Sequence, residues 1–433
     1  MPDLQIYGTD DSADSAREVV ITGVGMVTPI GIGRADFWNS LIEGQSGVRP
    51  LTRLDIDSLR VKFGGEVAEF DPKAYVRPRK SLKVMSREIQ FGFAAADLAF
   101  RDAELSEGAI DHDRMGVVFG ADMMYCELDD LSDAYNSCMP EGEFDFSLWG
   151  SQALSQMYPL WMLKYLPNMP ACHIAIALDA HGPNNSITLG EVSGLLAIAE
   201  ATRVIERGQA DLMVAGGTST PLHPMNLISR GDAHLSHYAG DPAGACRPFD
   251  AGRGGVVLGE GAGALVLELR SHAEARGAKI LARVVGHGNA FAPQRGADTD
   301  TAGAIVRSLR QALGEAGLDP SDIGHVNAHG ISTVERDPIE AAAIREVLGD
   351  VPVTAPKSYF GYLGAGGGAV ELVASVLALE HGRVPVTLNY DEPDPQCPVN
   401  VIHDRPLPDA KPTALALNQA STGQAASLAI VRD

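Results

Sequence analysis

Residues 259–267 read GEGAGALVL, and residues 423–431 at the end of the chain read GQAASLAIV. Each stretch passes from small residues into an apolar, β-branched run, which is typical of a buried strand. Two further pairs of segments also match. EVVITGVG at 18–25 matches ILARVVGHG at 280–288, and the helix-then-strand pattern of 194–215 matches that of 369–387. An internal repeat of this kind predicts two similar halves that stack against each other and share an interface.

Apolar runs bounded by glycine and polar residues predict the strands of both halves. They cover residues 18–25, 115–120, 174–178, 211–217, 264–269, 280–288, 325–328 and 414–418. Helical patterns lie between them at residues 90–103, 194–207, 302–316, 339–348 and 369–379. Alternating strands and helices predict an α/β fold with largely parallel, buried sheets. We expect a disordered lead at 1–16, a first half at 17–273 and a second half at 274–433.

The composition narrows the classes of function. The chain has 433 residues, 45 % apolar and 21 % charged, with a net charge of −22. So acidic a protein is not expected to bind nucleic acid or an anionic membrane, because both require a basic surface. Five cysteines in a chain of this length indicate reduced thiols and not a disulfide framework. The acidic, polar start has no targeting pattern, so we expect a cytoplasmic protein.

Five motifs carry a family resemblance. They are REVVITGVGMVTPIG (17–31), GPNNSITLGEVSG (182–194), CRPFDAGRGGVVLGEGAGALVLE (246–268), VNAHGISTVERDPIEAAAI (326–344) and PKSYFGYLGAGGGAVE (356–371). Together they resemble the β-ketoacyl-ACP synthase family of the thiolase superfamily. The resemblance implies a thiolase fold, in which two duplicated α/β halves stack as α-β-α-β-α layers. It also implies that acyl groups arrive on the phosphopantetheine of an acyl carrier protein, with no other cofactor and no metal.

The family performs decarboxylative condensation with a cysteine nucleophile, two histidines, a lysine and a glycine-rich loop that carries a gating phenylalanine. Carried over to this sequence, the nucleophile position holds Glu191 and the second histidine position holds Tyr362. The first histidine, His329, and the lysine, Lys357, are retained. The loop at 418–425 reads NQASTGQA, so it has lost its phenylalanine and is about one residue shorter.

These substitutions predict that condensation is lost. A carboxylate is a much weaker nucleophile toward a thioester than a thiolate. Tyrosine is neutral at pH 7 and cannot carry the positive charge of an imidazolium. Two interpretations of Glu191 stay open: an acid that caps the following helix, or a protonated acid that resembles the glutamine of the family's chain-length-factor subunits. The sequence leaves the protonation state of Glu191 open.

The retained polar residues admit both a functional and a structural interpretation. His329 is either a catalytic remnant or a structural, hydrogen-bonded histidine. Lys357 is expected to pair with Glu340 or Glu371, and such an ion pair can be structural. Asp337 and Glu340 match an acidic motif of the family and are interpreted as structural support.

A basic cluster at residues 77–87 stands out in an acidic chain, and it predicts a docking patch for the anionic carrier protein. Its members are Arg77, Arg79, Lys80, Lys83 and Arg87. A solvated helix face is the alternative. His223, His234 and His237 suggest a metal cluster, but no acidic or thiol ligands complete it, so no metal is expected. The segment GVGMVTPIG lacks dinucleotide-loop spacing.

Three hypotheses follow for the function, and whether the chain is an enzyme stays open among them. The first is a non-condensing, chain-length-factor-like subunit of fatty-acid or polyketide-type assembly, which pairs with an active ketosynthase. The second is a malonyl-ACP decarboxylase, or another acyl-thioester enzyme, that uses His329 and Lys357 with Glu191. The third is a condensing enzyme whose cysteine lies elsewhere. A homodimer is the alternative to the heterodimer.

Overall fold

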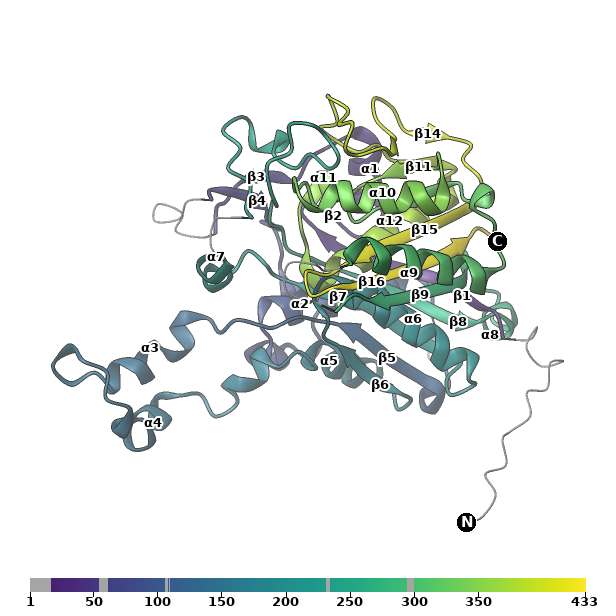
Figure 1. The fold of residues 1–433 in the computed structure, drawn as a ribbon. Coiled ribbons are helices and arrows are strands. Elements are labelled where there is room, and N and C mark those ends of the chain that lie inside the picture. Colours follow the sequence, from purple (N-terminus) through teal and green to yellow (C-terminus); the bar gives the residue numbers. More distant parts are fainter. Residues whose placement is uncertain (1–16, 54–60, 106–107, 109, 231–233, 294–299) are drawn as a thin grey trace, which may run out of the picture.

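The computed structural model describes residues 17–53, 61–105, 108, 110–230, 234–293 and 300–433. Two halves with the same strand order dominate it (Figure 1). The first half runs β1 (Val19–Thr28), β8 (Gly261–Leu269), β7 (Leu212–Ser219), β5 (Met115–Gly120) and β6 (Asn184–Ile187). The second runs β9 (Ala282–Phe291), β16 (Gln424–Val431), β15 (Thr413–Gln419), β10 (His325–Asn327) and β11 (Pro352–Thr354), with β13 (Asn400–Val401) at its edge. The predicted disordered lead lies outside the described residues.

The strand directions repeat as well, and they correct the prediction of largely parallel sheets. In each half the first two pairs are antiparallel and the next two are parallel. Parallel neighbours need a crossover connection, whereas β15 and β16 are joined by a tight turn that ends in Gly423, with φ +101°. β1 also pairs with β9 and β2 (Gly31–Ile32), so all these strands form one 12-stranded sheet.

Helices complete the α-β-α-β-α layers of the thiolase fold. The central layer holds α6 (Ser193–Glu206) and α12 (Gly367–His381), and almost every residue of α12 is buried. The two helices approach closely, because a Cβ on Gly194 would lie 3.0 Å from the Ala369 backbone nitrogen. The outer layers hold α2 (Arg87–Asp102) and α5 (Met169–Leu178) on one side and α9 (Thr301–Ala316) and α10 (Arg336–Leu348) on the other.

The predicted repeat is confirmed for β1 with β9, β8 with β16 and α6 with α12. The match of residues 383–387 to β7 is wrong. These residues contain β12 (Arg383–Val384), which pairs with β14 (Leu407–Pro408) in a separate sheet, and β15 occupies the place of β7. Residues 174–178 belong to helix α5 and not to a strand. A short apolar run fits either state, and here Pro170 at the helix start with several alanines favours the helix.

Two glycines of β1, Gly23 and Gly25, allow close packing of a helix. A Cβ on Gly23 would lie 2.3 Å from the Ala99 carbonyl oxygen, and one on Gly25 would lie 2.1 Å from that of Ala95. Since α2 carries both alanines, the glycines let this helix lie directly on β1. The tight contact sets the distance between the outer helix layer and the sheet.

Glu268 of β8 is a fully buried acid with three donors. Thr22 of β1 donates to it, and so do His272 of α8 (Arg270–Ala275), at 2.6 Å, and Arg276, at 2.6 Å. Burial alone would raise the pKa of Glu268, but these hydrogen bonds outweigh it and lower the pKa to about 2. The carboxylate therefore ties β1, β8 and α8 together.

An arm formed by residues 123–165 extends from the body after β5 (Figure 1). It carries α3 (Leu128–Ser137) and α4 (Leu154–Gln156) around a small core of Ala134, Cys138 and Ala153. Large apolar side chains of the arm are exposed, with Phe146 at 74 % and Met123 at 70 %. Such a surface is typical of an interface, because a solvated arm gains nothing from exposing these groups.

The remaining elements lie around the upper part of the fold in Figure 1. They are α1 (Arg34–Glu43), β3 (Val48–Pro50), β4 (Phe63–Gly65), α7 (Pro224–Arg230) and α11 (Lys357–Phe360). Over the described ranges, no helix is both long and apolar enough to cross a bilayer.

Candidate functional site

A cavity of about 430 Å³ opens where the two halves meet. Residues from both halves line it: Glu191, His234, Leu235, Val256, Leu258, Ile331, Thr333, Glu335, Arg336, Tyr362 and Ser421. More of its wall is apolar than polar, and its charged groups come from few positions. This is the composition of a site that accepts a mainly apolar ligand and orients it with a few polar contacts.

Glu191 lies at the start of α6, on the wall of this cavity. It occupies the 3₁₀ turn Gly190–Val192, and Gly190 supplies the positive φ of +59° that the turn requires. Ser193 fixes the turn, because its hydroxyl donates to the Gly190 carbonyl at 2.7 Å and accepts from the Leu189 amide at 2.8 Å. Glu191 is 7 % exposed and sits at a helix N-terminus, where free N–H groups and the helix dipole favour an electron-rich ligand or side chain.

Tyr362 and Ser421 share that cavity with Glu191. The Tyr362 backbone is held on both sides, since its amide donates to the Val257 carbonyl at 2.7 Å and its carbonyl accepts from Gly259 at 2.8 Å. Its ring is buried against Leu258 and other apolar side chains. The three regions that the sequence marks as altered, namely nucleophile, second histidine and loop, therefore meet in one place.

His329 and Lys357 form a buried network behind this wall. The Lys357 ammonium pairs with Glu371 and lies 3.2 Å from Nδ1 of His329. Asn418 donates to Glu371 at 2.7 Å and lies 3.3 Å from the same ring nitrogen. Because lysine and the asparagine amide are donors, Nδ1 accepts and the ring proton resides on Nε2. Of the two residues that the sequence offered as partners of Lys357, Glu371 is the one in contact.

The Nε2 atom of His329 is buried and has no hydrogen-bond partner among the described residues. Burial first, and then the charges of Lys357 and Arg336, hold the pKa of His329 well below its usual range. The imidazole is therefore neutral at pH 7 and presents one unused N–H donor. Neither His329 nor Lys357 belongs to the described cavity wall.

Comparisons with known proteins identify the family to which this chain belongs. Residues 16–273 match the family model "Beta-ketoacyl synthase, N-terminal domain", and residues 281–391 match "Beta-ketoacyl synthase, C-terminal domain". The chain belongs to the β-ketoacyl synthase family. It is therefore a ketosynthase-like protein, related to synthases of fatty-acid and polyketide chains.

Curated and solved relatives of this ketosynthase-like chain cover nearly its whole length. The 3-oxoacyl-[acyl-carrier-protein] synthase 2 of Synechocystis is 35 % identical over 89 % of this chain and 91 % of its own. The mitochondrial 3-oxoacyl-[acyl-carrier-protein] synthase of Arabidopsis thaliana is 34 % identical over 90 % of this chain and 88 % of its own. The ishigamide ketosynthase/chain length factor superimposes with a TM-score of 0.83 at 29 % identity, covering 96 % of this chain and all of that one.

A second solved relative is a complex of a ketosynthase with its acyl-carrier protein. It is "AntDE:AntF (apo): type II PKS acyl-carrier protein in complex with its ketosynthase bound to the hexaketide", with a TM-score of 0.83 and 29 % identity. It covers 96 % of this chain and all of that one.

Asp337 and Glu340 of the ketosynthase-like chain hold the segment that follows β10. Glu340 accepts from the backbone amides of His329 and Gly330 at 2.6 and 2.9 Å, and Asp337 accepts from those of Phe249 and Thr333 at 3.0 and 3.2 Å. Burial raises the pKa of Glu340 to about 8 and that of Asp337 to about 6. These contacts position the His329 backbone.

The five cysteines are all described, and none contributes to the described cavity wall. Cys246 and Cys397 are buried, and burial raises the pKa of each thiol to about 12. Such thiols carry almost no thiolate at neutral pH. The hypothesis of a cysteine nucleophile elsewhere in the chain therefore has no candidate at this site.

The predicted basic patch divides in two. Arg77, Arg79, Lys80 and Lys83 are exposed around the 3₁₀ segment Arg79–Val84. Arg87 is different and corrects the prediction, because it is a half-buried partner of Glu260. Its guanidinium makes two hydrogen bonds to that carboxylate, at 2.6 and 2.9 Å, and lies over the ring of Phe91.

Sequence reasoning missed several members of the site. Glu335 and Arg336 line the cavity, and both lie inside the quoted motif VNAHGISTVERDPIEAAAI, so their closeness to His329 along the chain was the available signal. Asn418 lies in the altered loop and reaches the His329 network. His234, considered above for a metal, lies on the cavity wall. Over the described ranges, no group of three or more potential metal ligands gathers.

Proposed function

We propose that this chain is a non-condensing, ketosynthase-like subunit that pairs with an active ketosynthase in fatty-acid or polyketide-type acyl-chain assembly. One observation carries the proposal: the position that would accept the acyl group holds the Glu191 carboxyl, on the wall of an open cavity of about 430 Å³. Acylation of a carboxylate by a thioester gives a mixed anhydride, which is less stable than the thioester itself. Transfer to Glu191 therefore runs uphill.

The open cavity favours a site that still binds a ligand over a site that has lost all function. Large side chains have not filled it, and the turn before α6 and the His329–Lys357–Glu371 network remain assembled. Tyr362 and Glu191 leave the same space open to a chain that enters without forming a covalent bond. A subunit of this kind would shape the space that an acyl chain occupies while its partner carries out the chemistry.

Two surfaces support pairing with a second ketosynthase-like chain. The arm of residues 123–165 exposes apolar side chains, including Phe146 and Met123. Within the described residues, β6 pairs only with β5, so one edge of the large sheet offers free backbone groups. An open edge beside an apolar arm favours a partner with a matching strand and a matching arm. A relative of the same fold meets both requirements.

An acyl carrier protein would deliver the acyl group to the pair. Arg77, Arg79, Lys80 and Lys83 form an exposed basic patch on an acidic chain and would attract an anionic carrier domain. The solved complex of a type II PKS acyl-carrier protein with its ketosynthase supports a carrier as partner for this chain as well.

Co-purification tests the pairing. The tagged chain is expressed in its native host, and the mass of the purified assembly is measured by light scattering. We expect a one-to-one complex with a chain that retains the nucleophilic cysteine. A matched variant with Phe146→Asp and Met123→Asp should release that partner, whereas Arg310→Asp and Arg345→Asp, on exposed helix faces of the second half, should retain it. A stable homodimer with no ketosynthase bound would refute the proposal.

A second candidate function is decarboxylation of malonyl-ACP, and one observation favours it. The unused Nε2–H of His329 could donate to the thioester oxygen as the bond to the carboxylate breaks and its electron pair forms an enolate. Carbon dioxide leaves, and a proton from water then gives the acetyl thioester. The isolated chain should release CO₂ from malonyl-ACP, and His329→Ala should abolish it. No release by the wild type, or unchanged release by the variant, excludes this function.

A further inference from the structure

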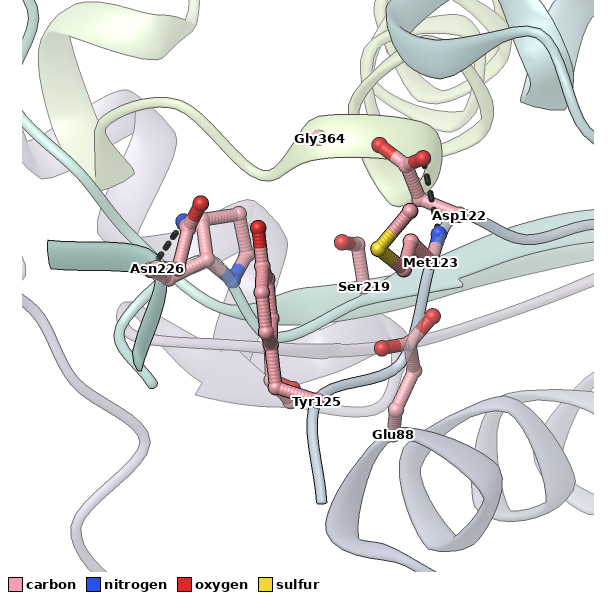
Figure 2. A pocket seen from close by; sticks show the side chains of 9 residues that line it. Glu88, Asp122, Met123, Tyr125, Ser219, Asn226 and Gly364 are labelled. Atoms are coloured by element: carbon pink, nitrogen blue, oxygen red, sulfur yellow. Dashed lines mark hydrogen bonds between the residues drawn. The ribbon is translucent and has the colours of Figure 1, made fainter. Parts of the chain in front are cut away.

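A second cavity, of about 190 Å³, lies at the carboxyl ends of the parallel strands β5 and β7 (Figure 2). Its wall is about evenly polar and apolar and is therefore more polar than that of the first cavity. Its polar members are Glu88, Asp122, Tyr125, Ser219, Thr220 and Asn226. Ligands of α/β folds commonly bind beyond the carboxyl ends of parallel strands. The position and the lining therefore make this cavity a candidate subsite.

The two cavities are lined by neighbouring segments of the chain. Tyr362 lines the first cavity and Gly364, two residues later, lines the second. The end of β7 and the segment after it link them as well, because Ser219 lines the second cavity while Leu222 packs in the apolar cluster of Tyr362. The turn Gly364–Gly366 also contacts the turn Gly190–Val192 that carries Glu191. One short stretch of chain thus contributes to both the polar cavity and the candidate acyl site.

Glu88 is the feature that points to a ligand. It lies in the first turn of α2, is 4 % exposed, and extends its carboxyl group toward Ser219 and Met123 (Figure 2). Its Oε1 atom has no hydrogen-bond partner among the described residues. Burial, and then the charge of Asp122, raise the pKa of Glu88 well above its usual range, although contacts with Asp122 and Thr220 oppose this. A buried oxygen left without a partner costs stability unless a ligand or water satisfies it.

We propose that this second cavity receives an oxygen-bearing part of a bound acyl chain, a neutral carbonyl or hydroxyl group, in preference to plain alkyl. The inference rests on the proposed function, because it assigns the kind of chain that the subunit accommodates. A carbonyl oxygen can accept a hydrogen bond from the Glu88 carboxyl group, whose raised pKa favours the protonated form, whereas an alkyl chain leaves the buried Glu88 oxygen without a partner. An anionic group is excluded, because Asp122 adds a negative charge to the wall.

Matched probes test the proposal in the full chain bound to its ketosynthase. Octanoyl-pantetheine and its 5-oxo and 7-oxo derivatives share one chain length and differ only in the added oxygen. Dissociation constants are measured by titration calorimetry for the wild type, Glu88→Gln, Glu88→Leu and, as a control on an exposed face of α9, Arg310→Asp. We expect an oxo chain to bind about tenfold more tightly than octanoyl in the wild type, in Glu88→Gln and in Arg310→Asp, and with no preference in Glu88→Leu.

Each outcome separates the two proposals. Equal affinities in the wild type overturn this inference and leave the proposed function in place, whereas failure of every probe to bind overturns both. A preference that survives in correctly folded Glu88→Leu refutes the role of Glu88. Tighter binding of 8-aminooctanoyl-pantetheine than of any oxo chain shows a cation site and overturns the inference as well. If Glu88→Leu does not fold, the wild-type preference alone decides.

Discussion

Lys357→Met is predicted to destabilise the protein strongly, because it removes one member of a buried ion pair. The side chains of Lys357 and Glu371 are 3 % and 1 % exposed, so neither charge is solvated. Without the ammonium, the Asn418 amide, 2.7 Å away, is the one donor to the Glu371 carboxylate that remains among the described residues. Removing one partner of a buried pair costs about 3–5 kcal/mol, because the other charge is left uncompensated. Glu371→Leu should cost a similar amount for the same reason.

The double variant separates this account from simple loss of packing. With both charges removed, the desolvation cost disappears, so Lys357→Met/Glu371→Leu should lie within about 2 kcal/mol of the wild type. Equilibrium urea unfolding of all four proteins measures the shift in midpoint at constant slope. Burial and, secondly, the Lys357 charge hold down the pKa of His329, so NMR titration of Lys357→Met should show that pKa moving upward. Additive costs of the two single variants, or single costs below about 1 kcal/mol, would refute the reasoning.

Three further predictions concern stability and docking. The donors to Glu268 lower its pKa from 4.5 to about 2, so the ionised carboxylate stabilises the fold fully above pH 4.5 and progressively less as the pH drops below that value. In urea unfolding, the wild type should lose about 1.4 kcal/mol of its stability advantage over Glu268→Gln when the pH is lowered from 7 to 3.5. Gly288→Ala in β9 should destabilise the protein by about 1–3 kcal/mol, because the new Cβ would lie 1.9 Å from a backbone oxygen of α9. Gly314→Ala, within α9 itself, meets nothing within 4 Å and should stabilise the protein by about 0.5–1 kcal/mol; thermal unfolding compares the two variants. Reversing Lys80 and Lys83 to glutamate should slow carrier-protein association about tenfold at low salt and much less at high salt, measured by stopped flow; an unchanged rate argues against the patch.

The duplicated fold was predictable because local patterns carry it. The runs of β8 and β16 share a transition from small to apolar residues, and those of β1 and β9 share an apolar run that ends in glycine. Glycines such as Gly23 mark where a helix must lie against a strand. The run at 174–178 misled because five apolar residues fit a helix as well as a strand, and only the context of Pro170 decides. The strand directions escaped prediction because they depend on how the chain connects its strands.

The sequence predicted which residues belong to the candidate site better than it predicted the contacts between them. Glu191 and Tyr362 could be located because their motifs are intact around them, and both line one cavity. Arg87 could not be assigned to Glu260, because the two residues are 173 positions apart and nothing local links them. The unpartnered oxygen of Glu88 was equally invisible, since it depends on loops after β5 and β7 that meet only in three dimensions.

The central claim is that no residue of this chain takes up an acyl group, because an acid occupies the acceptor position. Intact-protein mass spectrometry after incubation with octanoyl-ACP tests it directly, with Glu191→Cys as the comparator. We predict no added mass on the wild type and one octanoyl group on Glu191→Cys, since a thiol at the start of α6 becomes a reactive thiolate. A stable octanoyl adduct on the wild-type chain would contradict the account.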